Sequence, residues 1–67
     1  MELKERIAKN LYELRTEREL SKTKFAAKCG IDRRQYIGYE NGTHLPSLET
    51  LEKIAKAHNV TLSWLVR

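Results

Sequence analysis

Basic side chains gather in one short stretch of this sequence. Residues 22–34 hold five lysines and arginines against a single acidic residue, Asp32, whereas residues 1–21 and 35–67 each carry equal numbers of both signs. The formal net charge of the whole chain is +4, so the entire excess lies in this stretch. A localised basic patch on a balanced chain indicates a polyanionic partner, although a solvated surface gives the same composition.

Four of these cations occupy positions that are unfavourable for the stability of a helix. Lys22 and Lys24 open one predicted helix, and Arg33 and Arg34 open the next. Cations in a first helical turn oppose the helix dipole, whereas basic side chains and free backbone N–H groups together bind phosphate. A guanidinium fork also matches guanine O6 and N7. We therefore predict that Arg33 and Arg34 contact bases or phosphates; the alternative is a solvated surface.

The elements that must position these cations are expected to be helices. Apolar residues recur at helical spacing in residues 3–18 and 48–58, and alternating strand patterns are absent. We predict helices over residues 3–18, 22–29, 33–41 and 48–58 and a short turn after residue 61, with N-caps at Ser21, Asp32, Ser47 and Thr61. Gly30 suits the left-handed end of the second helix, and Asp32 with Gln35 suits a capping box.

Length and composition limit the chain to one small domain. Its 67 residues allow one modest core, and Cys29 has no second cysteine with which to form a disulfide or a zinc site. His44 is expected on a loop surface, and His58 near a helix end, where protonation would be favourable. No apolar run approaches 18 residues and charges begin at Glu2, so neither a membrane span nor a signal peptide is expected.

The two-helix unit that begins at Lys22 has a small residue, a glycine and five apolar residues at the spacing that two packed helices joined by a tight turn require. Ala26 lets two helices cross closely and Gly30 permits a tight turn between them, while the apolar positions are Phe25, Cys29, Ile31, Tyr36 and Tyr39. Further matching segments are Leu20-Ser21, Tyr39-Glu40-Asn41-Gly42, Pro46-Ser47-Leu48-Glu49-Thr50-Leu51, Ile54-Ala55 and Val60-Thr61-Leu62. With these residues the chain resembles the phage-repressor and Cro type of helix-turn-helix regulator over residues 7–65. It departs from that pattern at Lys22, where the family usually has Gln, and at Tyr36, where it has an aliphatic residue.

The resemblance implies an all-α, five-helix fold of the lambda-repressor type as a single domain over residues 1–67. Its second and third helices would form the helix-turn-helix, with the third in the major groove of double-stranded DNA. The family's base-reading positions fall on Lys22, Arg33, Arg34, Ile37 and Gly38, and its phosphate contacts on Asn41, Thr43 and His44. The predicted DNA-contacting set is completed by Thr23, Lys24 and Gln35.

Several of these positions allow a second interpretation. Ile37 suits contact with a thymine methyl group, or is exposed by chance. Gly38 suits close approach of the backbone to DNA, or is simply tolerated in its helix at a cost of about 1 kcal/mol relative to alanine. Gln35 also belongs to the predicted capping box, and Asn41 is a turn-forming residue before Gly42.

The resemblance also implies a structural ion pair and a dimer interface. Arg15 and Glu40 occupy positions at which the family forms a partly buried pair that orients the third helix. The last turn holds more apolar surface than it can bury inward, so Trp64 is expected to point outward, and the implied homodimer interface falls on Trp64 and Val66. The alternative is that Trp64 packs back onto the first helix.

The implied function is that of a sequence-specific, DNA-binding transcriptional regulator, with repression as the expected output. A homodimer would present two recognition helices about 34 Å apart to a two-fold operator. The sequence offers no enzyme active site, and we expect no cofactor, metal or inducer site. The expected location is the cytoplasm, in association with the nucleoid. Two alternatives remain open: an antitoxin-type protein-interaction module with autoregulatory DNA binding, and a restriction–modification controller protein, to which Asp32-Arg33 and Gly38 are also similar.

Overall fold

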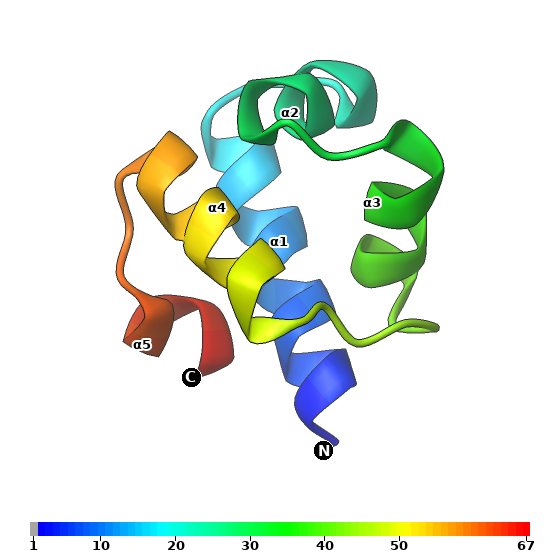
Figure 1. Cartoon of the computed structure of the whole chain (residues 1–67), viewed down its shortest axis with the longest axis vertical. Coiled ribbons are helices and arrows are strands. Elements are labelled where there is room, and N and C mark those ends of the chain that lie inside the picture. The colour runs from blue at the N-terminus through cyan, green and yellow to red at the C-terminus, as the bar shows by residue number, and fades with distance from the viewer. Residues whose placement is uncertain (1) are drawn as a thin grey trace.

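Residues 2–67, which the computed structural model describes, form five helices joined by short loops (Figure 1). In chain order they are α1 (Leu3–Glu17), α2 (Lys22–Cys29), α3 (Arg33–Asn41), α4 (Leu48–His58) and α5 (Leu62–Val66). The described residues contain no strand, and the prediction of an all-α, five-helix fold is confirmed. α1 ends one residue before the predicted position, because Arg18 is its C-cap and Glu19 turns the chain with a φ of +56°. No helix in this part of the chain is long and apolar enough to cross a membrane.

The N-terminal ends of α2 to α5 are capped by the residues that the sequence indicated. Three hydroxyl groups each accept a hydrogen bond from the backbone N–H three residues on, at 3.0 to 3.1 Å: those of Ser21, Ser47 and Thr61. In α3 the Asp32 carboxylate accepts from Arg34 N–H at 3.0 Å. The capping box predicted between Asp32 and Gln35 is therefore wrong, and the Gln35 side chain is exposed.

α1 lies at the centre of the core, with α3 packed on one side and α5 on the other (Figure 1). Its apolar stripe buries Ile7, Leu11 and Leu14. The Phe25 ring of α2 lies 4.9 Å, centroid to centroid, from the Tyr36 ring of α3, and both side chains are fully buried. The two helices of the helix-turn-helix are thus fixed to each other and to the core through these aromatic rings.

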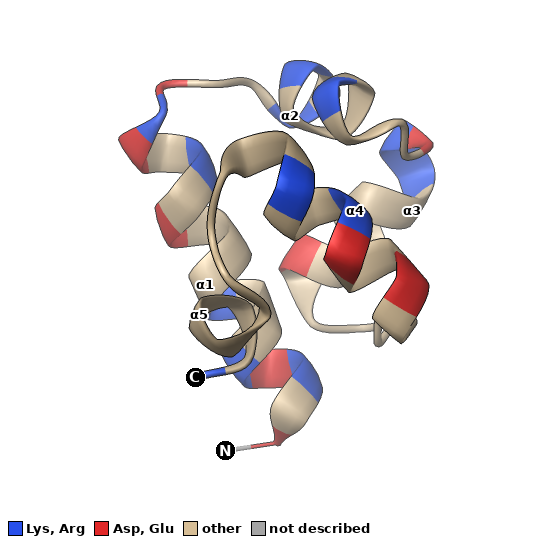
Figure 2. Cartoon of the chain, turned by 60° about the vertical axis from the view of Figure 1, so that its left-hand side comes forward, with Lys and Arg blue, Asp and Glu red and all other residues tan. Residues whose placement is uncertain are grey.

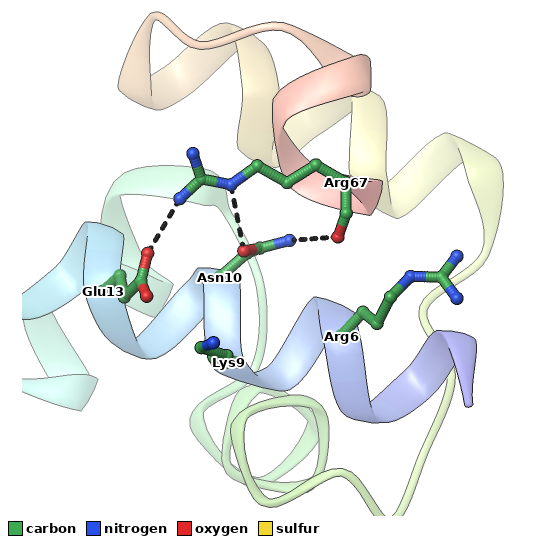
Figure 3. Close-up of a pocket in the computed structure, with 5 residues that line it drawn as sticks. All are labelled: Arg6, Lys9, Asn10, Glu13 and Arg67. Carbon is green, nitrogen blue, oxygen red and sulfur yellow. Dashed lines mark hydrogen bonds and ion pairs between the residues drawn. The ribbon is translucent and has the colours of Figure 1, made fainter. Parts of the chain in front are cut away.

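α5 is fastened to α1 by one buried amide, Asn10. Its Nδ2 donates to the carbonyl oxygen of Leu65 at 2.9 Å. With Arg67 it makes two bonds, Nδ2 donating to the carbonyl oxygen at 3.3 Å and Oδ1 accepting from Nε at 3.2 Å (Figure 3). Arg67 also pairs with Glu13 at 2.8 Å, beside a shallow pocket that these two residues line together with Arg6, Lys9 and Asn10 (Figure 3). These bonds join residues more than 50 positions apart and satisfy carbonyl groups at the C-terminal end of a five-residue helix.

Trp64 is partly buried and packs against the core cluster. The guanidinium carbon of Arg67 lies 4.1 Å from the centroid of the Trp64 ring. Trp64 therefore points outward only in part, because the core cluster and the Arg67 cation cover portions of its ring. Val66 beside it is also partly buried.

His58 lies in the core and not at an exposed helix end. Its side chain is 1% exposed and stacks on Phe25 with ring centroids 3.7 Å apart. Burial lowers the pKa of His58, and the nearby charges of Lys28 and Arg18 lower it further. The expected favourable interaction of a protonated His58 with its helix end is therefore wrong, since the folded protein favours the neutral imidazole.

The lowered pKa of His58 predicts that the domain loses stability in mild acid. The unfolded chain takes up the proton first, near the ordinary histidine pKa of about 6.5, so the stabilisation is complete above that pH and is lost as the pH falls below it. One proton changes the free energy of unfolding by at most about 1.4 kcal/mol per pH unit. Urea denaturation between pH 7.5 and 5.5 measures this slope. His58→Phe, which retains an aromatic ring on Phe25, should flatten it.

The matched control is the second histidine, His44, which is exposed. His44→Ala should leave the pH slope of stability unchanged. A slope that persists in His58→Phe would show that other groups cause the acid sensitivity.

Candidate nucleic-acid interface

The first turns of α2 and α3 carry basic residues (Figure 2), and a hydrogen bond from Arg33 to Thr23 joins them. Neither first turn contains an acidic residue, whereas α1 and α4 carry Glu5 and Glu49 in theirs. Both first turns thus carry cations where carboxylates are usual, and the only carboxylate at these two helix ends is that of Asp32, the N-cap of α3. Cations at a helix N-terminus attract an anion, and phosphate is the anion that such helix ends commonly bind.

The predicted DNA-contacting residues fall into three classes of exposure. Lys22 and Ile37 are partly buried and Gly38 is buried. The remaining side chains are exposed: Thr23, Lys24, Arg33, Arg34, Gln35, Asn41, Thr43 and His44. α3 buries Tyr36 and Tyr39 in the core and turns the arginines of its first turn to solvent. The outer surface of α3 is therefore free to approach a ligand.

One direct bond joins the two basic helix ends. Arg33 Nε, in the first turn of α3, donates to Thr23 Oγ1, in the first turn of α2, at 3.1 Å. Arg34 extends instead along a concave surface that it shares with Gln35 and His44. The two neighbouring arginines therefore have different surroundings.

Gly38 makes room for His44 and does not face outward. A Cβ atom built on Gly38 would lie 2.6 Å from Nδ1 of His44, so any side chain at this position would displace the imidazole. The Gly38 carbonyl accepts from Thr43 N–H at 3.0 Å and from the Thr43 hydroxyl at 3.1 Å, and this hydroxyl lies 3.1 Å from His44 Nδ1. Gly38 thus leaves room for the loop that carries Thr43 and His44, and its role as a base-reading position remains a prediction.

Gly38→Ala should move His44 without unfolding the domain. Alanine favours the helix interior by about 1 kcal/mol over glycine, but its methyl group displaces the imidazole, which is the end of a mobile side chain. We expect unchanged or slightly raised stability together with a loss of DNA affinity. Thermal denaturation and fluorescence-anisotropy titration of a labelled duplex measure the two effects.

The companion variant is His44→Ala, alone and combined with Gly38→Ala. If the glycine acts through His44, Gly38→Ala costs no further affinity once the imidazole is absent. An equal loss in both backgrounds would show that Gly38 itself approaches DNA.

Sequence reasoning missed Leu45 as part of this surface. Its side chain is 54% exposed and lines the same concave surface as Arg34, Gln35 and His44, with the largely buried Tyr39 beside them. A leucine in a polar loop directly after Thr43 and His44 was the available signal. The loop therefore presents an apolar group next to the polar ones.

The ion pair between Arg15 and Glu40 ties α1 to α3 behind this surface. Arg15 Nη2 lies 2.8 Å from Glu40 Oε1, Arg15 Nε donates to Glu40 Oε2 at 2.9 Å, and Arg15 Nη1 donates to the Leu20 carbonyl at 3.0 Å. The side chains are 14% and 4% exposed. Burial alone would raise the pKa of Glu40, but the hydrogen bonds and charge of Arg15 outweigh it and hold this pKa below its usual range. The carboxylate is therefore charged, and Arg15 joins it in α3 to the Leu20 carbonyl ahead of α2.

The remaining titratable groups indicate no metal centre or reactive thiol. Burial raises the pKa of Cys29 to about 11, so its thiol is neutral and packs as an apolar core group. Among residues 2–67, no three His, Cys, Asp or Glu side chains are grouped as metal ligands. The chemistry of the surface is that of cations, hydroxyl groups and an imidazole.

A helix-turn-helix with a basic, outward-facing second helix defines a class of DNA-binding transcriptional regulator, and comparison with known proteins agrees. The helix-turn-helix family model matches residues 11–65, and the chain belongs to this family. It is 43% identical over 54 residues to the cryptic phage CTXphi transcriptional repressor RstR of Vibrio cholerae. That match covers 81% of this chain but only 49% of the repressor, so this chain spans about half of that relative's length.

Two further relatives match over most of their length. The control protein C.MunI of a Mycoplasma species is 42% identical over 65 residues, covering 96% of this chain and 88% of that protein. The crystal structure of the restriction–modification controller protein C.AhdI from Aeromonas hydrophila superposes with a TM-score of 0.86 at 32% identity, covering 92% of this chain and 94% of the other. The resemblance to the phage-repressor and Cro type of regulator is thereby confirmed.

Proposed function

We propose that this domain binds specific sites in double-stranded DNA by inserting the first turn of α3 into the major groove. The observation that carries the proposal is the pair Arg33 and Arg34, exposed at that turn beside the basic first turn of α2. Arg33 and Arg34 would read base edges, while Lys22, Lys24 and the free N–H groups of α2 would hold phosphates. From the loop after α3, Thr43 and His44 would contact the phosphate backbone of the DNA.

The similarity to these relatives supports the proposal that the domain controls transcription. It would act on the DNA of the nucleoid, in the cytoplasm. Two forms of this role are candidates. Repression is favoured by the identity to the phage repressor, whereas a controller role is favoured by the similarity to two controller proteins over 88% and 94% of their lengths. The near full-length match leads us to propose the controller role as the second candidate. A reporter gene placed downstream of the bound site measures the direction of control, because a repressor lowers its expression and an activator raises it.

We further propose that the domain acts as a homodimer through α5 and the residues around it. Leu62, Trp64 and Val66 are only partly buried, so apolar surface remains at this end of the molecule. Trp64→Ala is expected to reduce the sedimentation coefficient to that of a monomer at micromolar concentration. Tyr12→Ala, which removes an exposed aromatic residue from α1, is the control and should leave the coefficient unchanged. A monomeric wild type, or a dimeric Trp64→Ala, would contradict this interface.

Selection of bound sequences from a random duplex library tests the DNA-binding proposal directly. We expect a two-fold symmetric sequence with at least one guanine in each half-site. Affinity for this sequence should fall steeply with salt, with a log–log slope of about −0.9 for each phosphate neutralised. An unenriched library, or an affinity that salt does not change, would reject the proposal.

A further inference from the structure

We propose that Thr23 is a positioning residue that sets Arg33 to read one guanine end-on. The inference rests on the proposed function, because it concerns how α3 reads DNA. Its origin is the bond from Arg33 Nε to Thr23 Oγ1, at 3.1 Å, between the first turns of two different helices. Thr23 thereby has a role distinct from the direct DNA contact that was predicted for it from the sequence.

Because Nε donates to Thr23, the edge of the Arg33 guanidinium formed by the two terminal nitrogens is the one that remains available to DNA. A guanidinium has five N–H donors in a planar fork, one on Nε and two on each Nη. With Nε engaged by Thr23, the two terminal nitrogens remain available and point away from the bonded edge. A pair of parallel N–H donors matches the O6 and N7 acceptors of guanine in the major groove. The geometry therefore selects the end-on bidentate contact over a side-on contact made through Nε.

The same bond restricts the conformations of an exposed side chain. Arg33 and Thr23 are both exposed, so neither is held in place by the core. A free arginine samples many rotamers and reaches phosphates as readily as bases, whereas a preset one loses less entropy when it binds. Thr23 should therefore contribute to discrimination between bases more than to overall affinity.

Arg34 provides an internal comparison. Its side chain lines the concave surface with Gln35, Tyr39 and His44, and no bond to α2 is found for it among the described residues. Removal of the Thr23 hydroxyl should consequently weaken recognition at the guanine read by Arg33 and leave the position read by Arg34 unaffected.

The test measures affinities of the full chain for the selected duplex and for duplexes in which each guanine is replaced in turn, at one fixed salt concentration. Thr23→Val removes the hydroxyl while keeping the shape, and Thr23→Ser keeps the hydroxyl. We expect Thr23→Val to lower discrimination at a single guanine by about fivefold or more, within the range of one bidentate contact. Thr23→Ser should retain most of the discrimination, and circular dichroism and melting temperature should be the same for all variants.

Arg33→Ala identifies which guanine is involved and closes a double-mutant cycle. Thr23→Val should cause no further loss of discrimination in the Arg33→Ala background. If Thr23→Val instead weakens binding equally to every duplex, Thr23 contacts a phosphate directly and the positioning role is rejected. If Thr23→Val matches the wild type at every guanine, the positioning role is also rejected. If Arg33→Ala itself leaves every guanine preference intact, Arg33 does not read bases and the failure lies in the proposed function.

Discussion

Arg15→Ala is expected to destabilise the domain by roughly 3 to 5 kcal/mol, the usual cost of removing one partner from a buried ion pair. The variant leaves Glu40 at 4% exposure without its cationic partner and removes the bond to the Leu20 carbonyl. A domain of 67 residues has a total stability of only about 3 to 10 kcal/mol. Much of the variant should therefore be unfolded at 37 °C, and urea denaturation measures the loss.

The chain contains a matched control for this prediction. Arg67 and Glu13 form a second ion pair with the same 2.8 Å separation, but their side chains are 50% and 43% exposed. Because solvent screens exposed charges, Glu13→Ala should cost no more than about 1 kcal/mol. Replacing Arg15 and Glu40 together by Met and Leu should recover part of the loss, since no unpaired charge remains. Equal effects at the two pairs would show that burial does not determine their contribution.

Arg33→Ala and Arg34→Ala are expected to weaken binding to the selected duplex by about 5- to 150-fold each, the range of one bidentate base contact. Both side chains are exposed, so the fold should not change. Affinity for unrelated duplexes should fall much less, because phosphate contacts remain. Anisotropy titrations with specific and non-specific duplexes measure both affinities, and far-UV circular dichroism checks the fold.

Lys56→Ala is the control for these arginines. Lys56 is an exposed cation in the last turn of α4. Its removal changes the net charge by the same amount but should leave specific binding within about twofold, as only the long-range field is altered. If Lys56→Ala weakens specific binding as much as Arg33→Ala does, net charge and not base contact explains the affinity.

Features set by near neighbours in the chain could be predicted from the sequence. The N-caps Ser21, Ser47 and Thr61 act within one helical turn, and Gly30 adopts the left-handed φ of +71° that its place after α2 requires. The outward direction of Arg33 also follows from the burial of Tyr36 and Tyr39. The pairing of Arg15 with Glu40 joins residues 25 positions apart and came from the family resemblance alone.

Contacts that depend on three-dimensional packing could not be predicted. Asn10 looked like an ordinary polar residue of a helix, and its bonds to the C-terminal segment span 55 and 57 positions. His58 is buried because α4 packs on α2, which no local pattern revealed. His44 lies over Gly38 because of the path of the loop that follows α3. The sequence does not reveal this path, so Gly38 was predicted to lie on the outer surface of its helix. The roles of Asn10 and His58 are set by distant chain segments, and that of Gly38 is set by the loop that follows its own helix.

Methylation interference on the selected duplex tests most directly whether α3 enters the major groove. Guanine N7 faces the major groove and adenine N3 the minor groove, so the methylated position that blocks binding reports the groove. We predict that N7 methylation of one or two guanines in each half-site abolishes binding, and that Arg33→Ala removes this sensitivity at one of them. Interference only at adenine N3, or an N7 pattern that neither Arg33→Ala nor Arg34→Ala changes, would contradict the account.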